Sequence, residues 1–105
     1  MSWIYLIIAA VFEIGWPLGF KLSQTTNHKL AWILFAVASM ALSGLFLWIA
    51  QKHIPMGTAY AVWTGIGAAG TFIVGVLLFQ DSASLWRVFS VFLIISGVVG
   101  LKLAS

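Results

Sequence analysis

The chain has no cysteine and very little charge. Of its 105 residues only 7% are Asp, Glu, Lys or Arg, whereas an ordinary soluble domain has about 25%. Without cysteine there is no thiolate with which to build a metal site. The five basic residues are scattered and form no clustered basic face, so we expect no nucleic-acid partner.

Hydrophobic residues make up 63% of the chain, more than a small soluble fold can bury. Four stretches are long enough to cross a bilayer, which takes about 20 apolar residues each. Short polar segments that contain Asn, Pro, Asp or Ser separate them. We therefore predict one all-α membrane domain over 1–105, with both termini on one side and spans at residues 3–22, 30–50, 58–79 and 85–103.

The basic residues are almost evenly divided between the two sides of the membrane. The side with the termini has Lys52 and Lys102, and the other side has Lys21, Lys29 and Arg87. Because Lys and Arg determine the orientation of a membrane protein, a balanced chain can insert both ways and pair as an antiparallel dimer. The alternative is that Lys21 lies too deep in the membrane to influence orientation, or that even a weak charge bias is sufficient to fix one orientation.

The most informative residue is Glu13, a carboxylate near the middle of the first span. No basic residue lies within a helical turn of it. A carboxylate in hydrocarbon is costly and is usually functional. Desolvation disfavours the charged form of such a group, so it can bind a proton and exchange it for a cation. The alternative is a protonated glutamic acid that only links helices.

Aromatic residues accompany this carboxylate at helical spacing. Trp16 shares the face of Glu13, and Tyr60 and Trp63 have the same spacing in the third span. A carboxylate beside aromatic rings is suited to an organic cation, because the ring faces attract positive charge. Tryptophan and tyrosine are also common at membrane interfaces, which is the alternative explanation.

Small residues in the second and third spans are candidates for contacts with Glu13 and for helix packing. Ser39 and Ser43 share one face and could donate hydrogen bonds to Glu13 or to their own helix. Gly65, Gly67 and Gly70 permit close helix packing, and they also lower the cost of a bend.

Other polar and small residues have weaker implications. Ser90 and Gly97 share a face of the fourth span and are candidates for a dimer contact. Asp81 lies in a loop and suits a helix cap. Pro17 has no N–H, so the carbonyl of Glu13 loses its usual helical donor and a kink is expected there. We find no catalytic arrangement, metal cluster or cofactor motif, and we expect a transporter rather than an enzyme.

Three segments together resemble a known family over essentially the whole chain. The long segment Pro55–Ala68 (PMGTAYAVWTGIGA) carries most of the resemblance, and Glu13–Trp16 (EIGW) and Gly100–Lys102 (GLK) add to it. In these segments the chain is similar to the small multidrug resistance transporters, and within them to the guanidinium-exporter subtype.

This resemblance implies an antiparallel dual-topology homodimer in the bacterial inner membrane that exchanges protons for small organic cations and needs no cofactor. It also implies that the central glutamate is Glu13 and that a serine, Ser43, bonds it. The remaining implied roles are cation binding by Trp16, Tyr60 and Trp63, a bend at Gly65 and Gly67, and dimer contacts at Ser90 and Gly97.

Two residues beside Trp16 depart from the subtype's pattern, and they bear on selectivity. Pro17 replaces a small residue such as Ala, and Gly15 replaces a β-branched residue. The large Trp16 favours guanidinium, because the quaternary-ammonium branch usually has a smaller residue there. Export of quaternary ammonium or other hydrophobic cations, and a role as one subunit of a heterodimeric pair, stay as alternatives.

Overall fold

The computed structural model describes residues 1–104, which fold into helices joined by short loops. The predicted all-α class with four membrane-spanning helices is confirmed. Each helix is slightly longer than the predicted span. The bounds are Ser2–Thr25 for α1, Lys29–Ala50 for α2, Met56–Phe79 for α3 and Leu85–Ala104 for α4.

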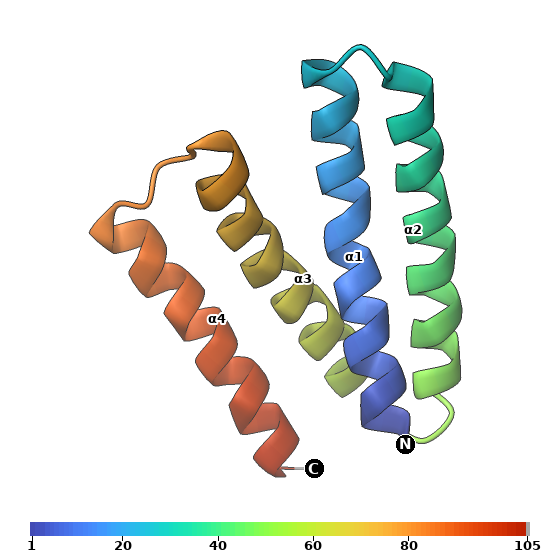
Figure 1. Ribbon diagram of the computed structural model, residues 1–105. Helices are drawn as coiled ribbons and strands as arrows, with labels where there is room; N and C mark the ends of the chain where they lie inside the picture. The colour runs from blue at the N-terminus through green and yellow to red at the C-terminus, as the bar shows by residue number, and fades with distance from the viewer. Residues whose placement is uncertain (105) are drawn as a thin grey trace.

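Each helix is long and apolar enough to cross a membrane. The shortest, α4, has 20 residues, and at about 1.5 Å per residue it spans the roughly 30 Å of a hydrocarbon core. The N- and C-termini lie at the same end of the molecule, opposite the loops α1–α2 and α3–α4 (Figure 1). The chain is therefore a multi-pass membrane protein.

The helix ends follow from the residues between the spans. Pro55 directly precedes α3, where its fixed φ suits a helix start and its missing N–H costs nothing. Gln80 ends α3 in the left-handed region, with φ 57° and ψ 33°. Helix α1 has no such end at Pro17, which lies inside it. A proline there removes one helical hydrogen bond without ending the helix.

The helices form a thin layer with α1 in its middle. Helix α1 packs against α2 and α3, and α4 packs along α3 (Figure 1). Near the C-terminal end of α4, the Lys102 ammonium also lies 4.8 Å from the centroid of the Trp3 ring on α1. The Cα trace measures 44 × 34 × 16 Å, so its smallest dimension is less than half of either of the others. A single chain this thin leaves most of each helix open to its surroundings.

Small residues explain the close packing of α1 on α2. A Cβ at Gly15 would come within 2.6 Å of the Ser39 Oγ, and one at Gly19 within 2.9 Å of the Trp32 carbonyl oxygen. Both glycines lie one turn apart on α1, so they form one flat strip against α2. Any larger residue would force the two helices apart.

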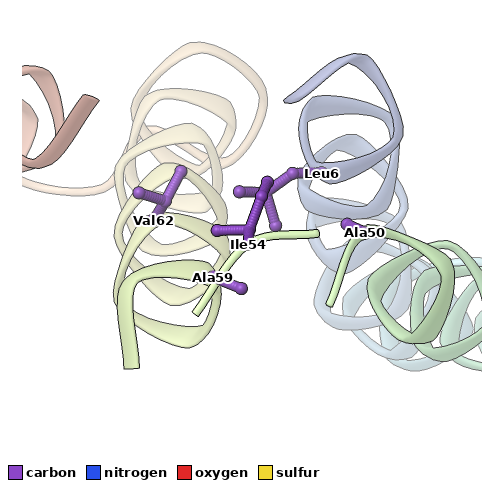
Figure 2. Packing of buried hydrophobic residues seen from close by; sticks show 5 residues of the cluster. All are labelled: Leu6, Ala50, Ile54, Ala59 and Val62. Carbon is purple, nitrogen blue, oxygen red and sulfur yellow. The ribbon is translucent and has the colours of Figure 1, made fainter. Parts of the chain in front are cut away.

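A small apolar core lies near the end of the molecule that holds the termini. Its buried members come from α1, from the last residue of α2, from the loop that follows it and from α3, and are Leu6, Ala50, Ile54, Ala59 and Val62 (Figure 2). This cluster joins α3 to the α1–α2 pair. Helix α4 contributes no buried residue at all.

Candidate functional site

The site is built around Glu13, in the middle of α1. The Trp16 Nε1–H donates a hydrogen bond of 2.7 Å to the Glu13 Oε1. The two residues are three apart on one helix, so their side chains lie on the same face. The predicted pairing of carboxylate and indole is therefore present, and it fixes the direction in which one carboxylate oxygen points.

Helix α3 makes room for this side chain with a glycine. A Cβ at Gly67 would lie 2.6 Å from the Glu13 Cγ and 3.2 Å from its Cβ, well inside ordinary contact of about 3.5–4.0 Å. Gly67 is itself buried. The glycine thus lets α3 lie directly against the stem of the glutamate.

The carboxylate opens into a cavity of about 300 Å³ between the three packed helices. Besides Glu13, the cavity is lined by Trp16, Met40, Gly44, Leu47 and Trp63. None of these residues is basic, so no fixed cation neutralises the carboxylate from the cavity wall. A carboxylate among aromatic and aliphatic walls is complementary to a small organic cation.

Ser43 does not bond Glu13, which corrects the contact implied by the family resemblance. The Ser43 hydroxyl donates to the Ala9 carbonyl oxygen at 2.7 Å and accepts from the Trp63 Nε1–H at 2.8 Å. A hydroxyl has one proton to donate, and the carbonyl on α1 takes it. Ser43 therefore links α1, α2 and α3, and it orients Trp63 rather than Glu13.

Tyr60 stands beside the cavity rather than in its wall. Its ring lies 5.4 Å from that of Trp63, at an angle of 48°. The side chain is 57% exposed on the outer surface of the single chain. It therefore reaches the site only through its contact with Trp63.

Pro17 and Gly65, predicted to shape the helices, lie outside this cavity. Pro17 lines a second cavity between α1 and α3, so its influence on the Glu13 carboxylate is indirect. A Cβ at Gly65 would lie 2.7 Å from the Val98 Cγ2 and 3.3 Å from the Ile94 Cγ2. Gly65 thus permits close packing of α4, and α3 is continuous through it.

The predicted dimer-contact residues face outward on α4. A Cβ at Gly97 would meet nothing within 4 Å, and Ser90 donates its hydroxyl at 2.8 Å to the carbonyl of Trp86 on its own helix. Neither residue is committed to contacts with another helix of the same chain.

Three further residues line the cavity wall, and helical spacing could have predicted them. Met40, Gly44 and Leu47 follow the i, i+4, i+7 pattern on α2. They flank the buried Ser43, so they lie on the edge of the face that meets α1. Their side chains carry no chemistry of their own, and for that reason they were not candidates.

Comparisons with known proteins agree with this geometry. The profile described as Small Multidrug Resistance protein matches residues 1–94. A guanidinium exporter of Yersinia pseudotuberculosis is 50% identical over 105 residues and over the full length of both chains. Guanidinium exporters of Proteus vulgaris and Citrobacter freundii are 44% and 45% identical over 105 residues, covering all of this chain and 100% and 99% of theirs.

The fold and the site together define a small four-helix transport protein of the membrane, with one carboxylate in the middle of its helices. The chain belongs to the small multidrug resistance family. It is accordingly a multi-pass protein of the bacterial inner membrane.

Proposed function

We propose that the protein is a proton-coupled exporter of guanidinium and small substituted guanidinyl cations. The observation that carries this proposal is the Glu13 carboxylate, held by the Trp16 indole in a cavity whose walls contain no basic residue. The guanidinium exporters that align over the whole chain support the same substrate class.

The chemistry of the site suits a planar cation with several donors. A guanidinium ion donates two parallel N–H bonds to a carboxylate, and charge-assisted bonds of this kind are about twice as strong as neutral ones. The rings of Trp16 and Trp63 offer faces on which the cation can stack. The Trp16 N–H occupies one lone pair of Oε1 and leaves the others free to accept.

Proton coupling follows from competition for one group. When Glu13 binds a proton, it loses the negative charge that a cation requires, and a bound cation in turn excludes the proton. Protons entering from outside therefore release the substrate, and substrate from the cytoplasm releases the protons. The proton is the coupling ion, and the scheme uses no cofactor.

The proposal requires two chains, because a single chain leaves the apolar surface of α4 uncovered. The Cα trace is 16 Å in its smallest dimension, and α4 contributes no buried residue. An antiparallel homodimer joined through α4, with Ser90 and Gly97 in the contact, would bring two Glu13 side chains to a shared chamber. In such a dimer the two open states are equivalent by symmetry.

Transport currents from purified protein on a solid-supported membrane test the substrate class. We expect currents for guanidinium and for a small alkylguanidinium, and much smaller currents for tetraethylammonium, which has no N–H to donate to Glu13. Larger currents for tetraethylammonium than for guanidinium would refute the proposed selectivity and favour export of quaternary ammonium ions. No current from this chain alone, with activity when a paralogue is added, would instead identify a heterodimeric pair.

A further inference from the structure

The chain has only two acidic residues, and the proposed mechanism uses one of them. The other, Asp81, follows α3 in the loop to α4. Its backbone N–H donates to the Gly75 carbonyl oxygen at 3.1 Å, after the left-handed turn at Gln80. Its Oδ2 lies against Gly75, in space that a Cβ there would fill. The backbone therefore places this exposed carboxylate against Gly75, in the last turns of α3.

Asp81 faces a second cavity, of about 200 Å³, between α1 and α3. Water occupies about 30 Å³ per molecule in the liquid, so the cavity has room for a small cation. Its polar and aromatic lining comes from Lys21, Thr71, Phe79 and Asp81, and Pro17 lies in its wall. A carboxylate, a hydroxyl and an aromatic ring thus converge on one space.

A cation of the protein itself, the Lys21 side chain, already stands in the wall of the cavity. The Lys21 ammonium lies 5.9 Å from the centroid of the Phe79 ring, within the range of cation–π attraction. Within residues 1–104 Lys21 and Asp81 form no ion pair, although both line the same cavity. Lys21 is exposed and long, so it can move away when another cation enters.

The cavity and the main site both lie against α1, and they share no lining residue. Lys21 is eight residues beyond Glu13, or about 12 Å along a helix that rises 1.5 Å per residue. Pro17 lies halfway between them, and because it has no N–H the Glu13 carbonyl lacks its usual helical donor. Pro17 lines this cavity, whereas Glu13 lines the main one.

We propose that this cavity is a vestibular binding site for small multi-donor cations, in which Asp81 and Phe79 hold a guanidinium ion before it reaches Glu13 and Lys21 occupies the place in its absence. This inference rests on the proposed function. Asp81 supplies the charge, Phe79 supplies a ring face, and Lys21 acts as a tethered competitor. The site raises the local concentration of substrate without taking part in proton exchange.

Two substitutions with opposite expected effects test the site. In guanidinium-driven currents from purified protein, Asp81→Asn should raise KM by about two- to fivefold, the factor expected for an exposed charge pair, with kcat little changed. Lys21→Gln should lower KM, because it removes the competitor. Lys29→Gln is the matched control: it removes the same charge from the same end of the molecule, and its residue lines neither cavity, so it should leave KM unchanged.

The opposite changes in KM expected for the two variants distinguish a binding site from a merely structural role. A structural role would lower kcat or the yield of folded protein in both variants. An unchanged KM in both Asp81→Asn and Lys21→Gln, or a shift in the same direction, would overturn the proposal. If Asp81→Asn does not fold, Lys21→Gln decides alone, and failure to lower KM refutes the site. The guanidinium-driven current of the wild-type protein tests the proposed function itself, and its absence would refute that function rather than the vestibular site.

Discussion

Adding one methyl group at Gly67 should damage transport much more than it damages the fold. In Gly67→Ala the new Cβ would lie 2.6 Å from the Glu13 Cγ, about 1 Å inside ordinary carbon–carbon contact. Either α3 moves away from α1 by that amount, or the Glu13 side chain rotates. A rotation of this size would break the 2.7 Å hydrogen bond from Trp16, because the carboxylate lies beyond the displaced Cγ.

The magnitude follows from the cost of overpacking, which is about 1–3 kcal/mol. If the strain is relieved by displacing Glu13, that cost appears in kcat/KM as a loss of about 5- to 150-fold. Guanidinium-driven currents from reconstituted protein measure it, and thermal unfolding in detergent checks the fold. Gly57→Ala is the control, since it adds the same methyl group to α3 where nothing lies within 4 Å. Equal, wild-type-like kcat/KM in both variants would refute the argument that Gly67 positions Glu13.

Three further predictions concern the surroundings of the site. Ser43→Ala removes the hydrogen bonds to Ala9 and from Trp63, so the free energy of unfolding in detergent should fall by about 1–3 kcal/mol. Ser96→Ala, which loses only a hydrogen bond within α4, is the control, and an unchanged unfolding midpoint for Ser43→Ala would contradict the prediction. Pro17→Ala restores an N–H for the Glu13 carbonyl, and the ratio of currents for substituted over simple guanidinium should change; an unchanged ratio, with both proteins folded, would make the proline purely structural. Gln24→Lys with Asn27→Lys adds two charges where α1 ends and the α1–α2 loop begins, so a C-terminal reporter should appear on one side of the membrane only. The unmodified chain should show the reporter on both sides, and a reporter found only in the cytoplasm would exclude dual topology.

The helices were predictable because each depends on local composition. Four apolar stretches of membrane-spanning length, separated by polar segments, leave few alternatives in lipid, where every backbone group must be bonded within its own helix. Glu13 and Trp16 were predictable together because a spacing of three residues places two side chains on the same face of a helix. Their hydrogen bond involves no other helix.

The contacts between helices were not predictable in the same way. Ser43 could bond Glu13, its own helix or another helix, and only the packing of α1 on α2 brings it to the Ala9 carbonyl. Spacing also predicted that Pro17 acts near Glu13, but its ring faces the neighbouring cavity. The sequence suggested only a helix cap for Asp81, because the left-handed turn at Gln80, which places it against Gly75, leaves no pattern in the sequence.

The central claim is that one carboxylate binds either a proton or the substrate. Its most direct test is proton movement in proteoliposomes that contain a pH-sensitive dye, with a guanidinium gradient as the driving force. The wild-type protein should move protons against the guanidinium flow, and Glu13→Gln, which keeps the shape of the side chain but not its charge, should move none while remaining folded. Proton movement by Glu13→Gln at the wild-type rate would contradict the account.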